Sequence, residues 1–419
     1  MKFSNVLYSA PAEFELFDSA LRDVKSGKYL LQKAPFIQLD SVTWKKISPT
    51  LFLLIIFFFM PWRSYASPDK LTIYNESKAY QGYTIFYSMD EEAIKILDML
   101  GAEVRTLKAP GAMNPKPLSN GNILTTVESR IQGHTLVEID KSMNFFYQFY
   151  DQDYYFLHHD QEKTPEGNYL VLGGIFDDNY PLIKPGTLRD DFILELDPSG
   201  NIVWQWFSSD HFASFDFSDE ALKIIWEGGL YDSKGEDVFH TNSIHILPEN
   251  KFYDQGDDRF KPGNIVVSQR DTNIVFIIDK NSGEIVWKLG PNDSITIGQH
   301  NANMIPKGYV GAGNILIFDN GGIAGFPPQT RSSSRVIEVN SDKEVVWQYT
   351  AHNSGQAAEE FSSDFMGGAQ RLLNGNTLIC EADSGRIFEV TRDGEIVWEY
   401  QHTNKVYRAY RVSPEFMVQ

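Results

Sequence analysis

A phrase that ends in tryptophan recurs along the chain and constrains its fold more than any other feature. The clearest copies are Gly200-Asn-Ile-Val-Trp204, Gly283-Glu-Ile-Val-Trp287, Lys343-Glu-Val-Val-Trp347 and Gly394-Glu-Ile-Val-Trp398. Each copy follows an apolar run that ends in an acidic or polar turn, a pattern typical of a β-hairpin. Weaker copies lie earlier, over residues 94–107 and 136–149. The chain therefore carries six units of one kind.

A second phrase, a Gly-Asn turn followed by an apolar strand, opens the units. Its copies begin at Gly121, Gly167, Gly263, Gly313 and Gly375. Units that share an order of phrases but differ in loop length indicate a β-propeller, in which each four-stranded blade buries its faces against its neighbours. The sequence predicts an all-β, six-bladed β-propeller over residues 67–419. We expect the tryptophans to be apolar spacers between blades and the surplus length to lie in loops 207–239 and 319–334.

Composition excludes several classes of protein. Hydrophobic residues make up 42% and aromatic residues 14% of the 419 residues, which supplies a core and excludes wholesale disorder. A formal net charge of −19 argues against a nucleic-acid partner, because phosphate backbones are bound by clustered Lys and Arg. The single cysteine, Cys380, excludes a disulfide framework and any zinc site built on paired cysteines.

The segment before the repeats has the features of a secretory signal peptide. Lys45 and Lys46 precede an apolar run over 51–60, and the small residues Ser64 and Ala66 follow it. We predict cleavage after Ala66, so that 1–66 form an N-terminal extension with the signal peptide and the true start lies downstream of Met1. The run is shorter than the roughly 20 residues of a transmembrane helix. The predicted location is periplasmic or secreted, and the alternatives are an uncleaved membrane anchor or a buried or interfacial apolar stretch.

Three polar phrases precede the openings of successive units. They read His158-His159-Asp160, His240-Thr241-Asn242 and Gln299-His300. The strand that leads into a propeller blade is the innermost one, so equivalent positions converge near one end of the central axis. Three histidines from three blades could act as nucleophile, acid and base, or bind a metal ion. Each histidine could equally hydrogen-bond the loop backbone near the axis.

These phrases, together with Phe318-Asp-Asn-Gly321, Gly368-Ala-Gln-Arg-Leu372 and Asn374-Gly-Asn-Thr-Leu-Ile379, resemble the arylsulfotransferase family over essentially all of 80–402. The resemblance implies a periplasmic six-bladed propeller. It also implies transfer of a sulfuryl group from a phenolic sulfate ester to a phenol, through a sulfated histidine. That reaction uses neither the nucleotide donor of cytosolic sulfotransferases (PAPS) nor a cofactor, and no metal ion is expected. The expected partners are the two small molecules, with a homodimer as a further option.

The resemblance assigns residues one by one. His240 and His300 match histidines that contact sulfate oxygens or do acid–base work, and the arginine that follows Phe-Asp-Asn-Gly in the family corresponds to Arg331 or Arg335. The expected substrate-binding residues are His158, His159, Asn242 and Arg371. Because the chain is acidic, a site for an anionic ester needs local positive charge.

One departure from the family concerns the nucleophile. Characterised members carry their sulfated histidine on a late blade, in a region that here reads Ser362-Ser-Asp-Phe-Met-Gly-Gly-Ala-Gln370 and has no histidine. Another histidine then replaces it, or the chain does different chemistry or none. The alternative is a non-catalytic propeller that binds a small aromatic or anionic ligand or a partner protein. A quinone-dependent dehydrogenase is disfavoured by six units rather than eight and by the lack of an adjacent cysteine pair.

Overall fold

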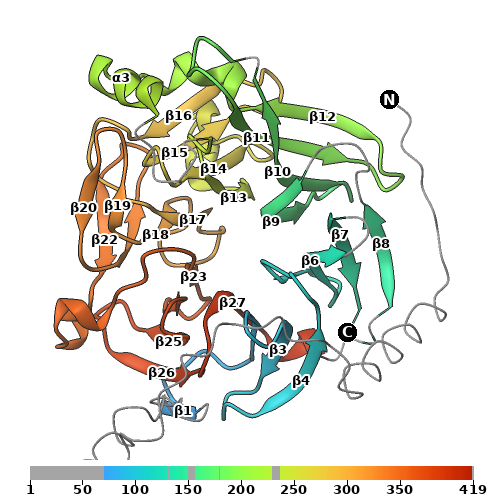
Figure 1. The fold of residues 1–419 in the computed structure, drawn as a ribbon. Coiled ribbons are helices and arrows are strands. Elements are labelled where there is room, and N and C mark those ends of the chain that lie inside the picture. The colour runs from blue at the N-terminus through green and yellow to red at the C-terminus, as the bar shows by residue number, and fades with distance from the viewer. Residues whose placement is uncertain are drawn as a thin grey trace, which may run out of the picture. The chain divides into compact units, whose positions relative to one another are not determined.

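The structure, a computed structural model, describes residues 70–417 except 130–132, 141, 143, 150–155, 179 and 229–235. The predicted signal peptide, its apolar run at 51–60 and the cleavage site after Ala66 lie outside the described residues. Within the described part, no helix is long and apolar enough to cross a membrane. The described chain consists mainly of β-strands, which Figure 1 shows as sheets arranged around a common axis.

Six antiparallel blades surround this axis, and their inner strands contact one another from blade to blade. Each blade is given from its inner to its outer strand. The first blade consists of β27 (Val406–Val412), β2 (Tyr83–Ser88), β3 (Ala93–Leu97) and β4 (Glu103–Lys108), and the second of β5 (Lys116–Pro117), β6 (Ile123–Ser129), β7 (Gly133–Ile139) and β8 (Phe145–Phe149). The third consists of β9 (Phe156–Lys163), β10 (Tyr169–Asp177), β11 (Leu188–Leu196) and β12 (Ile202–Phe207). The fourth blade consists of β13 (Thr241–Ile246), β14 (Ile265–Gln269), β15 (Ile274–Ile278) and β16 (Ile285–Leu289), and the fifth of β17 (His300–Met304), β18 (Ile315–Asp319), β21 (Arg335–Val339) and β22 (Val345–Tyr349). The sixth consists of β23 (Gly368–Arg371), β24 (Thr377–Glu381), β25 (Arg386–Val390) and β26 (Ile396–Gln401). The predicted six-bladed β-propeller is confirmed.

Both ends of the described chain close the ring. The C-terminal strand β27 pairs with β2 and so completes the first blade from the inside. Strand β1 (Lys70–Tyr74) pairs with the outer strand β26 and adds a fifth strand to the last blade. Overlapping the two ends in this way ties the first blade to the last, so that few strand edges remain open.

The tryptophans of the repeat link neighbouring blades, as the spacing of the phrase predicts. Four indole Nε1–H groups each donate a hydrogen bond of 2.9 Å to a turn carbonyl of the next blade: Trp206 to Gly283, Trp287 to Ser341, Trp347 to Arg392, and Trp398 to Met99. In the third blade this bond comes from Trp206 rather than Trp204, which is only partly buried against the core. The phrase thus supplies apolar packing and one polar bond per interface.

The surplus length lies in the two predicted loops. Between β12 and β13 the chain forms η2 (Ser209–Phe215) and α3 (Asp219–Glu227), whose N-cap Ser218 accepts a hydrogen bond from the backbone of Ala221. Between β18 and β21 it forms the hairpin β19 (Gly322–Ala324) and β20 (Gln329–Arg331). A smaller insertion, α4 (Lys251–Asp254) and η3 (Asp258–Phe260), connects β13 with β14. The six blades themselves are uninterrupted by these insertions.

β-Bulges interrupt four inner strands near the end at which each begins. The extra residues are 158–160 in β9, Asn242 in β13, 301–302 in β17 and 407–408 in β27. Within or beside them, His159, His240 and Asn301 have φ angles of 60°, 49° and 50°. Such angles are uncommon for residues other than glycine. A bulge changes the direction in which a side chain points, so these bulges position the histidines at the axis.

Candidate functional site

The histidines of two neighbouring inner strands meet at the axis. The rings of His159, in β9, and His240, immediately before β13, pack edge to face with centroids 5.2 Å apart. The ring of His158 lies 4.9 Å from that of His159. The convergence expected from the repeat therefore brings His158, His159 and His240 into one cluster, which we call the histidine cluster.

His240 is held by an aspartate that sequence reasoning missed. Its Nδ1 lies 2.6 Å from Asp237 Oδ2, and its backbone N–H donates to Asp237 Oδ1 at 2.9 Å. Burial alone would lower the pKa of His240, but the charge and hydrogen bond of Asp237, with a contribution from Asp271, raise it. No described residue hydrogen-bonds to Nε2, and the side chain is 30% exposed. The raised pKa of His240 favours the doubly protonated ring, in which Nε2 carries a proton.

His159 has the opposite protonation state. Its Nδ1 lies 2.7 Å from Nδ1 of His158, whose Nε2 faces Asp191 Oδ1 at 3.4 Å. The carboxylate of Asp191 favours the tautomer of His158 with its proton on Nε2; in that tautomer His158 Nδ1 is an acceptor, the His159 proton lies on Nδ1, and His159 Nε2 is unprotonated. Burial lowers the pKa of His159 well below its ordinary value, and the nearby His158 and His240 lower it further. His159 is thus a neutral imidazole with a free lone pair on Nε2.

Arg189, in β11, connects the two aspartates behind the histidines. Its guanidinium lies 3.3 Å from Asp191 Oδ1 and 2.7 Å from Asp237 Oδ2. Burial would raise the pKa of Asp191, but Arg189 and His158 hold it below its usual range. Asp191 also accepts a hydrogen bond of 2.5 Å from the backbone of Thr241. One guanidinium therefore fixes the carboxylates that orient both imidazoles, although neither Arg189 nor Asp191 belongs to a recurring phrase.

Arg270 supplies a second positive charge. It follows β14, its backbone N–H donates to His240 O at 3.1 Å, and its guanidinium pairs with Asp271. Asp237, His240 and Asp271 could offer one metal-ligand atom each within 4.8 Å. Both carboxylates, however, are already paired with guanidinium groups, and a divalent cation would lie against two positive charges. The carboxylates at the histidine cluster are therefore committed to guanidinium groups.

His300 is bonded through both ring nitrogens. Nδ1 donates to Asn320 Oδ1 at 2.8 Å, and Nε2 accepts the backbone N–H of Met366 at 3.2 Å. Asn320 in turn donates to the carbonyls of Ser363 and Met366, at 2.8 and 2.9 Å. Burial, with the charge of Arg270, lowers the pKa of His300 well below its ordinary value. His300 therefore holds the turn that replaces the late-blade histidine of the family, and it offers no free nitrogen.

The three arginines that the family resemblance assigned to the site lie outside the histidine cluster. Arg331 and Arg335 both pair with the fully buried Asp319, at 2.9 and 2.7 Å. Arg371 pairs with Glu338 at 2.9 Å, with both side chains at most 2% exposed. It lies at the far end of β23, about 10 Å along the strand from Gly368 at about 3.3 Å per residue. These arginines balance buried carboxylates between strands and blades.

Asn242 links the inner strands beneath the histidine cluster. It is fully buried, its Nδ2 donates to Gln299 O at 2.9 Å, and its own carbonyl accepts from Arg408 at 3.3 Å. Arg408 also pairs with Asp160 at 3.1 Å. Beside it, the Tyr407 hydroxyl donates to His159 O at 3.4 Å. No sequence signal identifies Tyr407 or Arg408, because only closure of the ring brings β27 to the axis.

Comparison with known proteins gives one match in sequence and several in shape. Residues 114–403 match the family model described as Arylsulfotransferase (ASST), whereas no curated protein matches. A protein of unknown function from Bacteroides caccae is similar in structure with a TM-score of 0.49 and 12% identity, covering 79% of this chain and 98% of that one. A streptogramin B lyase has a TM-score of 0.43 and 12% identity, covering 82% of this chain and 86% of that one. Apo AztD from Citrobacter koseri has a TM-score of 0.40 and 9% identity, covering 79% of this chain and 97% of that one.

Likeness of this degree carries no argument about function. The family match, in contrast, spans well over half of the chain and includes every residue of the histidine cluster. The chain belongs to the arylsulfotransferase family.

Proposed function

We propose that the protein transfers the sulfuryl group of an aryl sulfate ester to a phenol, with His159 as nucleophile and His240 as general acid and base. Family membership supports the reaction class. The observation that carries the assignment is the contact between an imidazole of lowered pKa and one of raised pKa. Groups whose environments move their pKa values apart are suited to opposite roles in proton transfer.

In the first half-reaction, the free Nε2 of His159 attacks the sulfur atom. A nitrogen–sulfur bond forms while the bond between sulfur and the phenolic oxygen breaks, and its electron pair stays on the oxygen. His240 gives its Nε2 proton to that oxygen, so that a neutral phenol leaves. The sulfated ring of His159 carries positive charge, which its Nδ1–H bond to His158 and the carboxylate of Asp191 stabilise.

In the second half-reaction, an acceptor phenol occupies the place of the first. The neutral His240 removes the phenolic proton, and the oxygen attacks the sulfur atom on His159. The nitrogen–sulfur bond breaks with its electron pair on nitrogen, which restores both histidines to their initial states. A water molecule in place of the phenol would give hydrolysis to sulfate by the same steps.

The charges around the histidine cluster fit the anionic sulfate. Sulfuryl transfer requires positive or N–H groups on the equatorial sulfate oxygens. In this proposal the protonated His240 supplies one such group, and Arg270 becomes a second one by exchanging its partner Asp271 for the sulfate. The local positive charge offsets repulsion of the ester by the acidic chain. Export through the segment at 51–66 remains part of the proposal.

The test is release of 4-nitrophenol from 4-nitrophenyl sulfate by the full chain, with and without added phenol. We expect phenol to accelerate release, and His159→Ala and His240→Ala each to lower the rate by at least 100-fold. The control is His352→Ala, because His352 is an exposed histidine on η4 (Ala351–Ser354), a surface turn of another blade. Mass spectrometry of acid-labile adducts in quenched protein locates the sulfuryl group on the peptide that contains His159.

Two outcomes contradict the proposal. Phenol-dependent release that survives His159→Ala would exclude His159 as the nucleophile. No release by folded protein with a panel of phenols would exclude the transferase and leave the alternative, a propeller that binds a small aromatic or anionic ligand or a partner protein. Equilibrium binding of 4-nitrophenyl sulfate to the same sample then separates a ligand-binding protein from one that does not recognise the ester.

A further inference from the structure

A cavity of about 290 Å³ lies at the end of the axis opposite the histidine cluster. The inner strands β5, β23 and β27 reach it where they end, through Pro117, Arg371 and Val412, whereas the histidines lie where the inner strands begin. Arg371 ends β23, about 10 Å along the strand from Gly368 at about 3.3 Å per residue, and Met366, the partner of His300, precedes Gly368. None of the residues that line the cavity belongs to the histidine cluster.

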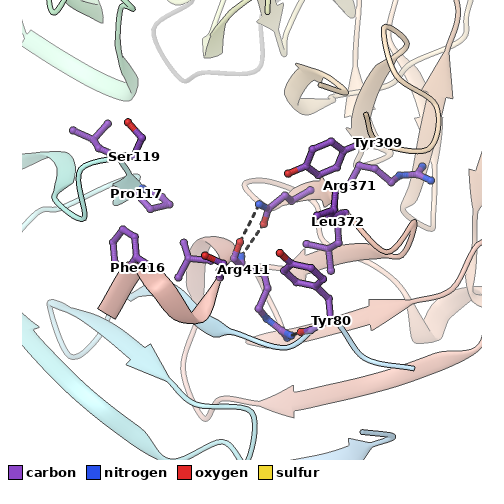
Figure 2. A pocket seen from close by; sticks show the side chains of 13 residues that line it. Tyr80, Pro117, Ser119, Tyr309, Arg371, Leu372, Arg411 and Phe416 are labelled. Carbon is purple, nitrogen blue, oxygen red and sulfur yellow. Dashed lines mark hydrogen bonds between the residues drawn. The ribbon is translucent and has the colours of Figure 1, made fainter. Parts of the chain in front are cut away.

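The walls of the cavity combine aromatic and aliphatic side chains with polar groups, among them the hydroxyl groups of Tyr80, Tyr309 and Ser119. Figure 2 shows Tyr80 and Tyr309 on one side and Pro117, Ser119 and Phe416 on the other. Leu372 and Val412 add aliphatic surface. Between these walls, Gln370 is held through both ends of its amide, since Nε2 donates to Arg411 O at 3.1 Å and Oε1 accepts from Arg411 N at 2.7 Å. The cavity is therefore preformed rather than filled by a loose side chain.

The two arginines in the lining do not offer their charge to a ligand. Arg371 pairs with buried Glu338 and stacks on Trp347 at 4.7 Å. Arg411 pairs at 3.2 Å with Glu389, and both of these side chains are fully buried. Figure 2 shows the Arg371 guanidinium directed away from the tyrosine hydroxyls. Glu338 also pairs with Arg392, but the side chains of Arg371 and Arg411 are at most 1% exposed, so neither guanidinium group is open to a ligand in the cavity.

The tyrosine hydroxyls are the polar groups available to a ligand. Neither Tyr80 nor Tyr309 makes a side-chain hydroxyl hydrogen bond to another described residue. Burial raises the pKa of Tyr80, the charges of Tyr309 and Glu415 raise it further, and the charge of Arg411 lowers it. Tyr80 and Tyr309 lie on the same side of the cavity (Figure 2), where a neutral hydroxyl group can donate to one tyrosine and accept from the other.

We propose that this cavity is a second binding site, separate from the histidine cluster, for a small neutral aromatic compound that carries a hydroxyl group. The volume is ample for one six-membered ring, because an apolar cavity of about 150 Å³ holds benzene. The ring packs against Phe416, Leu372 and Pro117, and its hydroxyl group lies between Tyr80 and Tyr309. The site exists whether or not the protein transfers sulfuryl groups.

The test is binding of 4-fluorophenol to the full chain, followed by the ¹⁹F line width and chemical shift of the ligand. We expect saturable binding that survives His240→Ala but is at least 10-fold weaker in the double variant Tyr80→Phe/Tyr309→Phe. Ser119→Trp, at an exposed rim position, should block the cavity without disturbing the core. Tyr253→Phe is the matched control, because Tyr253 is an exposed tyrosine on α4.

Competition distinguishes the chemistry of the ligand. Unlabelled phenol should displace 4-fluorophenol. In contrast, 4-fluoroanisole cannot donate a hydrogen bond and should bind at least 10-fold more weakly than 4-fluorophenol. Phenyl sulfate should not displace 4-fluorophenol from the His240→Ala variant. The proposal is overturned if wild-type protein does not bind 4-fluorophenol or if His240→Ala abolishes binding. It is also overturned if Tyr80→Phe/Tyr309→Phe and Ser119→Trp both bind 4-fluorophenol as tightly as wild type does. The sulfuryl-transfer assay is independent of all three results, so either proposal can fail alone.

Discussion

Two imidazoles with opposite pKa directions occupy adjacent positions in the histidine cluster, because a carboxylate contacts only one of them directly. Asp237 contacts His240 directly, and its negative charge favours the protonated ring. Asp191 acts on His159 only through His158, so burial dominates there and favours the neutral ring. Sequence alone does not separate these cases, because His159 and His240 both lie in polar phrases that precede the opening of a unit.

The first prediction at the residue scale concerns pH. The reactive form needs neutral His159 and protonated His240, so the value of kcat/KM should fall at pH values well below 6.5 and again above 6.5. Asp237→Asn removes the charge that raises the pKa of His240, and the alkaline limb should move to lower pH by about one unit. Initial rates with 4-nitrophenyl sulfate, quenched to a common pH before reading, measure the shift.

Asp393→Asn is the control for that profile, since Asp393 is an exposed aspartate in a turn of the last blade. An alkaline limb that stays in place in Asp237→Asn would show that another group provides the acid.

The second residue-scale prediction separates His300 from the histidine cluster. His300→Ala removes the hydrogen-bond partner of the Met366 N–H and of Asn320 Oδ1, which should lower the free energy of unfolding by about 1–3 kcal/mol. Because neither nitrogen of His300 is free, folded His300→Ala should keep a larger share of the transfer rate than His159→Ala does. Urea unfolding and the 4-nitrophenol assay on the same samples compare the two effects. A loss of activity equal to that of His159→Ala, with unchanged stability, would give His300 a chemical role.

At the scale of elements, the β-bulges and the tryptophan hydrogen bonds have different structural roles. The bulges at the start of β9, β13 and β17 turn side chains toward the axis, while the tryptophans hold the outer strands in place. Alternating apolar residues predict the strands, but a bulge arises from the pairing of two strands and leaves little trace in either sequence alone. For this reason the phrases indicate where the histidines gather but not how their rings are oriented.

The prediction at this scale is the contribution of one interblade bond. Trp347→Phe removes the bond to Arg392 O and weakens the contact with Arg371, so the free energy of unfolding should fall by about 1–2 kcal/mol. Trp226→Phe, at a half-exposed position of α3, should change it by less than about 0.5 kcal/mol. The midpoint of urea unfolding measures both. Equal effects of the two substitutions would show that the interblade bond adds nothing to stability.

At the scale of the whole molecule, stability depends on how the ring closes. β27 supplies the inner strand of the first blade and carries Tyr407 and Arg408 to the axis, whereas β1 only extends the outer edge of the last blade. Loss of an inner strand exposes a blade and removes buried ion pairs. Loss of an added outer strand exposes little apolar surface.

Truncation tests this difference. A chain that ends before Val406 should fail to give a cooperative unfolding transition. A chain that starts at Asn75 and so lacks β1 should fold but lose about 2 kcal/mol, because only Leu71 and Tyr74 of that strand pack against the core. Circular dichroism during heating and urea titration measures both, with a chain that starts at Ser67 as the reference. Cooperative folding without β27 would contradict the role given to closure.

The recurring phrases determine a large part of this protein, since strand alternation, Gly-Asn turns and tryptophan spacing are local in sequence. They predict the six blades, and repeat equivalence predicts that histidines from three blades, His158 and His159, His240, and His300, converge. Of these, His158, His159 and His240 meet in the histidine cluster, whereas His300 holds the turn at Met366. The pairing of each histidine depends instead on contacts between blades, which no local pattern encodes. Asp237, Arg189 and Arg270 lie outside the phrases and meet the histidines only after the blades pack.

The same reason applies to the positions that the family resemblance assigned to the substrate. Arg331, Arg335 and Arg371 have the right chemistry for a sulfate, but buried carboxylates of neighbouring strands already hold them. Whether an arginine faces a ligand or an ion pair depends on which side of its strand is covered, and that is decided when the sheets assemble into a ring. Sequence therefore specified the number and kind of the parts, and tertiary packing specified which of their charges remain available for chemistry.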